Sequence, residues 1–202
     1  MRLRFLFSAV AVGAMLLVAA PVQASVQRDM AAVRLFADTS VVGWSTLERH
    51  PASVQMTLRT SGLPAGHVVT VWWIIFNHPE FCQFGEAATA ATGFAGTKCG
   101  AGDLGIVEGL AADPRVQPSA VHATGHVIGS SGVGDFAGYL SAGSTNSQII
   151  LGGGLTNPLG ADIHLLVHSH DTAVGDGALG QEIKTFGATA GSDLQFSAHE
   201  AG

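Results

Sequence analysis

The stretch "HVVTVWWIIFN", residues 67–77, is apolar at nearly every position. Side chains of a strand alternate between two faces, so this run predicts a strand that is buried on both sides in the middle of a sheet. Alternation also places Trp72 and Trp73 on opposite faces. Core packing is the favoured role for both rings. The alternative is that one of them offers a stacking surface to a sugar or an apolar ligand.

Further strands are indicated along the chain by apolar residues at every second position. Residues 53–60, "SVQMTLRT", and 193–200, "DLQFSAHE", alternate in this way, and "DIHLLVHSH" over 162–170 is another strand. "AVHATGHVIG" over 120–129 and "DFAGYL" over 135–140 flank the turn "SSGVG", which predicts a hairpin. Short strands at this spacing predict an all-β fold, an antiparallel β-sandwich or partly closed barrel.

The N-terminus has the features of an export signal. Arg2 and Arg4 precede an apolar run over residues 5–20, and small residues lead to a cut ahead of Ser25. The run is shorter than the about 20 residues that a membrane span requires. We therefore predict a cleaved signal peptide over residues 1–24, a periplasmic or secreted protein, and no membrane span after cleavage.

The predicted mature chain, residues 25–202, is acidic. It holds seven basic and fifteen acidic residues, a formal net charge of −8. Such a balance argues against nucleic acid or an anionic membrane surface as a partner. The length is typical of a single core, so we predict one β-sandwich domain over this range.

The chain has two cysteines, Cys82 and Cys99, and after the predicted export both are expected to be in an oxidising compartment. We predict a disulfide between them, which would stabilise the fold by about 3 kcal/mol. Ligation of a metal by the two thiolates is the alternative, and the missing C-x-x-C spacing argues against it.

The histidines are candidate metal ligands. In the strand "DIHLLVHSH", His164, His168 and His170 share one face, and the backbones of the last two lie roughly 7 Å apart. His122 and His126 are expected on one face of their own strand, where they could complete a site. Imidazole ligands in an exported protein suit copper or zinc. The alternative is that these histidines line a solvated sheet face or bond to nearby backbone.

No catalytic constellation is evident. The chain has no G-x-S-x-G elbow, both cysteines are expected to be bonded, and no pair of acids is singled out by the pattern. We therefore expect a non-catalytic binding or envelope-associated module, with an unknown small ligand or envelope partner. A copper- or zinc-binding protein, including a redox-active one like superoxide dismutase, is the alternative.

The chain resembles a family of exported bacterial β-rich proteins described only as hypothetical. The likeness runs from Ser53 to His199 and rests on "TLRTSGLPAGHVVTVWWIIFNHPEFC", "CGAGDL", "HATGHVIGSSGVGDFAGYL", "GLTNPLGADIHLLVHSH" and "QEIKTF" with "LQFSAH", of which the WWxxFNxPxxC run is the most specific part. The resemblance implies export, a β-rich fold and pairing of the cysteines, and it implies no activity. Relatives often carry further cysteines near "GATAGSD" and arginine in place of His168. Copper-zinc superoxide dismutase, a more distant analogy, also uses an HxH strand, but its surrounding histidine and aspartate pattern is missing here.

Overall fold

The computed structural model describes residues 26–85, 96–145, 148–173 and 191–201. The predicted signal peptide and its cleavage site lie outside the described residues. Among the described residues, no helix combines the length and the hydropathy needed to cross a membrane.

The described residues form nine strands in a single antiparallel sheet, in the order β6-β3-β2-β1-β9-β8-β4-β5-β7. The all-β prediction is confirmed. The strands are β1 (Gln27–Leu35), β2 (Val41–His50), β3 (Ser53–Thr60), β4 (His67–Phe76), β5 (Pro118–Val127), β6 (Gly134–Ser141), β7 (Ile149–Leu151), β8 (Asp162–Thr172) and β9 (Ser192–His199).

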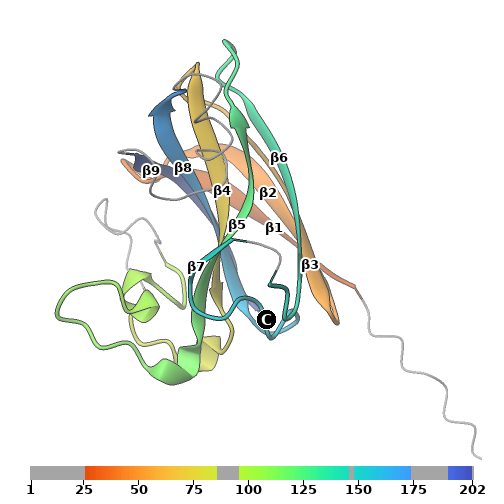
Figure 1. Ribbon diagram of the computed structural model, residues 1–202, viewed down its shortest axis with the longest axis vertical. Coiled ribbons are helices and arrows are strands. Elements are labelled where there is room, and N and C mark those ends of the chain that lie inside the picture. The colour runs from red at the N-terminus through yellow and green to blue at the C-terminus, as the bar shows by residue number, and fades with distance from the viewer. Residues whose placement is uncertain (1–25, 86–95, 146–147, 174–190, 202) are drawn as a thin grey trace, which may run out of the picture.

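The sheet curls back on itself, so that its two halves face each other as the layers of a half-closed barrel (Figure 1). One half is β6-β3-β2-β1 and the other is β9-β8-β4-β5-β7. Both halves contribute side chains to one apolar core, among them Leu47 and Leu58 from the first half and Trp73 and Leu165 from the second. Burial of these side chains is the main favourable contribution to the fold.

Strand β4 lies between β8 and β5, and all of its residues after His67 are buried. This confirms the strand predicted from "HVVTVWWIIFN". Strand β3 confirms the alternating prediction as well, because Val54, Met56 and Leu58 are buried, whereas Gln55, Thr57 and Arg59 are exposed. Hydrophobic periodicity therefore identifies both central and half-buried strands in this chain.

The predicted hairpin across "SSGVG" is wrong. Strand β5 pairs with β4 and β7, whereas β6 pairs with β3 in the opposite layer. The connection over residues 128–133 packs against the β3–β4 connection, where the amide of Leu63 donates to the carbonyl oxygen of Gly132 at 3.0 Å. Both connections cross between the layers, so the glycine-rich turn links two layers instead of two neighbouring strands.

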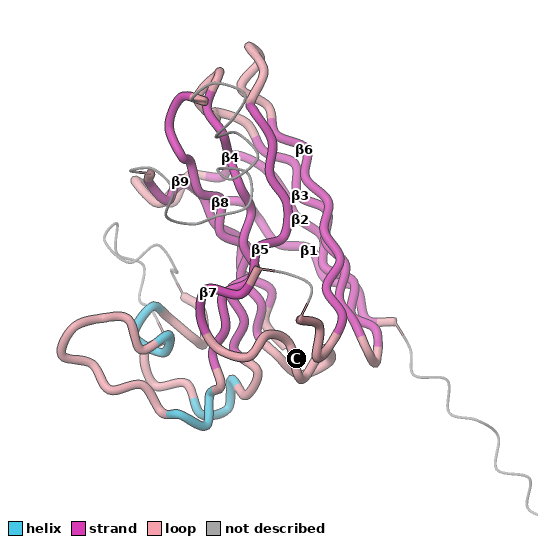
Figure 2. The backbone as a smooth tube through the Cα atoms, viewed as in Figure 1, coloured by secondary structure: helices cyan, strands magenta, loops and turns pink. Residues whose placement is uncertain are grey.

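The described residues 77–85 and 96–117, which lie between β4 and β5 in the sequence, are here together called the outer loop. It contains three 3-10 turns, η1 (Pro79–Phe81), η2 (Ala101–Leu104) and η3 (Pro114–Val116), which gather beside one end of the sheet (Figure 2). The outer loop packs on the face of β4, β5 and β8 that points away from the main core. A second apolar cluster forms there, in which Trp72 and Phe76 contact Leu104 and Val116.

Candidate functional site

The two tryptophans point to opposite faces of β4, as predicted. Trp73 lies in the core between the layers, and Trp72 lies in the second cluster beneath the outer loop. Neither side chain retains exposed surface. The suggestion of a ligand-stacking ring is thus corrected, because both rings are covered by packing from their own faces.

Three histidines gather on the outward face, the same face that carries Trp72. The rings of His168 and His170 meet edge to face, with centroids 4.8 Å apart, and the ring of His122 lies 5.2 Å from that of Trp72. Strand pairing explains the grouping, because His122 lies opposite Trp72 across β5 and β4. We call His122, His168 and His170 the histidine group.

His170 is held by a short hydrogen-bonded chain. The indole N–H of Trp72 donates to Oγ1 of Thr70 at 2.8 Å, and that hydroxyl lies 3.0 Å from Nε2 of His170. Burial, with the neighbouring His168 and His122, lowers the pKa of His170 to about 4. The ring of His170 is therefore neutral at pH 7.

His168 is oriented by a carboxylate. Its Nδ1 donates to Oδ1 of Asp193 at 2.7 Å, and the two residues are partners across β8 and β9. A carboxylate on one ring nitrogen fixes the tautomer and directs the other nitrogen, Nε2, away from it. In this structure Nε2 points toward the backbone of Gly191, where an added Cβ would lie 2.5 Å from it.

His126 does not join the histidine group. A bulge in β5 shifts the register after His122, so that Thr124 pairs with Val71 and His126 with Val69. Val69 belongs to the main core. There the ring of His126 stacks on that of Phe136, with the ring centroids 4.5 Å apart. The expectation that both histidines of β5 share a face is wrong because the bulge adds one residue between them.

His164 lies on the outward face of β8 but away from the histidine group. Its ring meets Phe76 at 5.2 Å, and it is completely buried. Burial lowers the pKa of His164 to about 3. This histidine is a neutral part of the packing beneath the outer loop.

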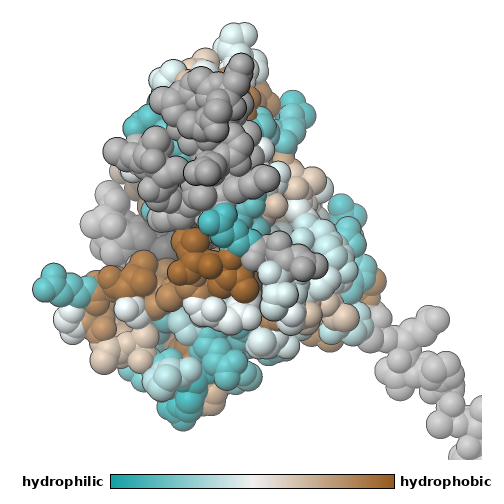
Figure 3. Space-filling model, in the orientation of Figure 1, coloured by the Kyte–Doolittle hydropathy of each residue, from teal (hydrophilic) through white to brown (hydrophobic). Residues whose placement is uncertain are grey.

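A large apolar pocket, here called the outer pocket, opens between this face and the outer loop. Its volume is about 970 Å³. Of the sixteen described residues that line it, fourteen are apolar or glycine, and Gln83 and Asp193 are polar. The sheet contributes Ile74, Ala120, Leu151 and Leu166, and the outer loop contributes Phe84, Leu104, Ile106, Val107 and Leu110. Figure 3 shows hydrophobic surface gathered in this part of the molecule.

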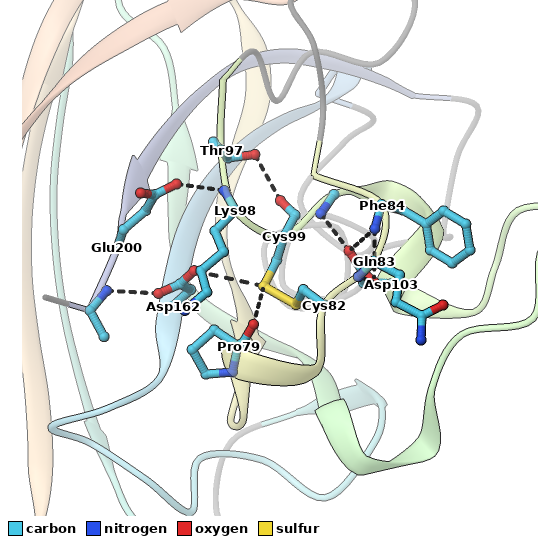
Figure 4. The surroundings of a disulfide bond; sticks show 12 residues. Pro79, Cys82, Gln83, Phe84, Thr97, Lys98, Cys99, Asp103, Asp162 and Glu200 are labelled. Carbon is cyan, nitrogen blue, oxygen red and sulfur yellow. Dashed lines mark hydrogen bonds between the residues drawn. A yellow bond between two sulfur atoms is a disulfide. The ribbon is translucent and has the colours of Figure 1, made fainter.

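A disulfide and a buried carboxylate shape the loop wall of the outer pocket. Cys82 and Cys99 are bonded, with their Cα atoms 5.2 Å apart, which confirms the predicted pairing. The carboxylate of Asp103 accepts hydrogen bonds from the amides of Gln83, Phe84 and Gly100 (Figure 4). The disulfide and the carboxylate of Asp103 fix the backbone next to both cysteines. Residues of the pocket wall, such as Gln83 and Ala101, lie directly after these fixed points in the sequence.

The sulfur atoms of Cys82 and Cys99 and a carboxylate oxygen of Asp103 lie within 4.8 Å of one another, close enough in distance for a shared metal ion. Both sulfurs are bonded to each other, however, so neither is a thiolate, and the carboxylate already accepts three backbone amides. Among the described residues the nitrogens of the histidine group do not converge to that degree. In their present rotamers these three rings are not a ready-made three-ligand site.

Residues near the C-terminal end of the described chain also hold the outer loop in place. The carboxylate of Glu200 accepts the amide of Lys98 at 2.6 Å, and the carboxylate of Asp162 accepts the amide of Ala201 at 2.7 Å. Asp162 is fully buried, and burial raises its pKa. Its Oδ2 lies 3.7 Å from Sγ of Cys99, so the disulfide is covered from the sheet side.

Sequence reasoning did not find the outer pocket, Asp193 or Thr70. One signal was present. The segment over residues 104–110 holds Leu104, Ile106, Val107 and Leu110 in a stretch with no strand or helix periodicity. Ile106 keeps 66% of its surface exposed and Leu110 keeps 41%, and grouped apolar exposure of this kind marks binding surfaces.

No protein-family model and no curated protein matches the sequence. A mutant of a SOD-like protein from Bacillus subtilis is similar in structure, with a TM-score of 0.38 and 10% sequence identity over 86% of this chain and 97% of that chain. Likeness at this level identifies neither a family nor an activity.

Proposed function

We propose that this protein is a non-catalytic binding protein whose outer pocket takes a small apolar molecule. The observation that carries the proposal is the pocket itself, about 970 Å³ in volume, whose described lining consists almost entirely of apolar residues and glycines from the outward face and the outer loop. Ligand pockets in proteins usually measure about 300–1,000 Å³ and combine apolar walls with a few polar groups.

The energetics support a ligand. Ile106, Leu110 and Ile150 remain 66%, 41% and 45% exposed at this pocket. Covering such surface with a ligand stabilises the complex by about 0.8 kcal/mol for each methylene buried. Without a ligand, these side chains stay in contact with water and this free energy is not gained. Their exposure therefore favours a binding role for the pocket over a purely structural one.

The test is titration with the fluorescent apolar probe N-phenyl-1-naphthylamine. We expect saturable binding, and a rise of about fivefold or more in Kd for the double variant Ile106→Asn, Leu110→Asn. The matched control is Met30→Asn, Val41→Asn, which changes two exposed apolar residues outside the outer pocket. Absence of saturable binding, or an equal change in both variants, would overturn the proposal.

A second candidate function is binding of copper or zinc by the histidine group. Two observations favour it: the ring of His168 is oriented by Asp193, as in many histidine ligands of metals, and that of His170 is neutral. The rings of His122, His168 and His170 would have to rotate to bring their nitrogens about 2.1 Å from one ion.

Isothermal titration of Cu²⁺ and Zn²⁺ into the purified protein tests this candidate. Binding that is lost in His168→Ala and in His170→Ala, but kept in His50→Ala at the end of β2, would support it. Equal binding by all four proteins would assign the metal to adventitious imidazoles.

The disulfide is typical of an oxidising compartment outside the cytosol. We propose that the protein works in the periplasm or the extracellular medium, after removal of the predicted signal peptide. Cell fractionation followed by mass measurement of the purified protein tests this. Intact mass beginning at Ser25 is expected, and recovery of the full-length chain from the cytosol would contradict it.

A further inference from the structure

We infer that the outer pocket selects neutral or amine-bearing apolar ligands and disfavours those that end in a carboxylate. The inference rests on the proposed binding function and concerns the ligand's polar end. It follows from the one charged side chain that the described lining carries, the carboxylate of Asp193.

Asp193 is held in place and still has accepting capacity. One oxygen accepts the Nδ1 proton of His168 at 2.7 Å, and 41% of its side chain is exposed. A carboxylate has about four lone-pair positions, so a ligand N–H or O–H group can be received beside the histidine. The pairing of His168 with Asp193 across β8 and β9 places this acceptor at the edge of an apolar wall.

No lysine or arginine is found among the described residues that line the outer pocket. The outer loop does carry two cations, but they are engaged elsewhere. Arg115 pairs with Asp113 and stacks on the ring of Phe81, with its Cζ 4.2 Å from the ring centroid. The charge of Lys98 acts on the carboxylates of Glu80 and Asp162, and neither cation belongs to the described lining of the pocket.

A ligand carboxylate in this pocket would therefore face a like charge in apolar surroundings, where the repulsion is stronger than in water. The acidic balance of the whole chain adds a weaker repulsion. An ammonium group would instead form a charge-assisted hydrogen bond with Asp193, and a hydroxyl group would form a neutral one. The order of affinity expected from these contacts is amine, then alcohol, then acid.

The experiment uses three ligands with the same alkyl chain: decylamine, decanol and decanoate. Each is titrated at pH 7 against the protein loaded with N-phenyl-1-naphthylamine. We expect decanoate to displace the probe with an affinity about fivefold or more below that of both other ligands. Asp193→Asn should reduce the amine-to-acid ratio to about half or less of the wild-type value, with little change for decanol.

Asp135→Asn is the matched control, because it removes the same charge from an exposed position on β6, outside the outer pocket. The control should keep the wild-type ratio. Decanoate binding within fivefold of decylamine, or an equal change in both variants, overturns the inference while leaving the pocket's function intact. Failure of all three ligands to displace the probe contradicts the proposed function itself. The wild-type ratio decides the question even if Asp193→Asn does not fold.

Discussion

The hydroxyl of Ser45 lies 2.8 Å from Nε2 of His199, inside the core between the two layers. On the other side of the ring, Nδ1 donates to the carboxylate of Asp29 at 2.8 Å. Ser45 lies on β2, His199 on β9 and Asp29 on β1. The hydrogen bonds link them as serine, histidine and carboxylate, which is the arrangement of a hydrolytic triad. Burial lowers the pKa of His199, so its ring is neutral at pH 7 and its Nε2 accepts a hydrogen bond from the Ser45 hydroxyl.

The first prediction is that this Ser45–His199–Asp29 chain is structural. Only 2% of the surface of Ser45 is exposed to solvent, so a substrate carbonyl has no access to its hydroxyl. A fluorophosphonate probe should leave Ser45 unlabelled. Ser45→Ala should lower the free energy of unfolding by about 1–3 kcal/mol, because it leaves a buried ring nitrogen without its donor.

The control for this prediction is Ser61→Ala, which removes an exposed hydroxyl bonded to a backbone carbonyl. It should change the unfolding free energy by less than about 0.5 kcal/mol. Covalent labelling of Ser45, or equal stability of the Ser45 and Ser61 variants in urea melts, would contradict the structural role.

The second prediction concerns pH. The folded-state pKa of His164 is about 3, below its ordinary value of 6.5. Below pH 6.5 the unfolded chain binds a proton that the folded protein does not, so stability is complete at neutral pH and decreases as the pH falls. For this one residue the loss between pH 7 and pH 5 is about 2 kcal/mol.

Burial lowers the pKa values of His170 and His199 too, so they add losses of the same sign. The measurement is guanidinium unfolding at several pH values for the wild type and His164→Leu. The variant should lose about 2 kcal/mol less between pH 7 and pH 5. Parallel stability curves for the two proteins would show that His164 does not titrate in this way.

Strand periodicity predicted much of the fold from local sequence. The runs that became β3, β4, β8 and β9 were identified because burial on one or both faces imposes a period of two. The connection of strands was harder to predict. The turn "SSGVG" has good hairpin chemistry, but the partners of β5 and β6 are chosen by packing between layers, which no local pattern encodes.

The candidate site was predicted only in part, for a similar reason. Alternation correctly grouped His168 with His170, because the pairing of β8 with β4 stays in register through Ser169 and shifts only beyond that residue. It failed for His126 because the bulge after His122 depends on pairing with β4. The outer pocket was missed because its loop wall follows no period and takes its course from the disulfide and from Asp103.

The third prediction links the disulfide to binding. Cys82 directly precedes the pocket residues Gln83 and Phe84. The double variant Cys82→Ser, Cys99→Ser should lower the unfolding free energy by about 2–4 kcal/mol. It should also weaken binding of the naphthylamine probe by about fivefold or more, because the loop wall loses its covalent anchor.

A general loss of stability has to be separated from a loss of the pocket wall. Val54→Ala, in the core between the layers, should lower stability by a comparable amount, about 1–3 kcal/mol, and leave probe affinity unchanged. If the double serine variant binds the probe as tightly as the wild type under conditions where it is folded, the disulfide has no part in shaping the pocket.

The last prediction concerns Gly43, where β2 passes very close to β3. A Cβ at this position would overlap the carbonyl oxygen of Arg59 and the Cα of Thr60. Both obstacles are backbone atoms held by the β2–β3 ladder, so they cannot move without breaking its hydrogen bonds. Gly43→Ala should therefore lower the unfolding free energy by about 2–3 kcal/mol or more. Gly129→Ala is the control, because a Cβ there meets open space, and it should stay within about 0.5 kcal/mol of the wild type in the same urea melts. Equal stability of the two variants would mean that β2 and β3 are not paired in this register.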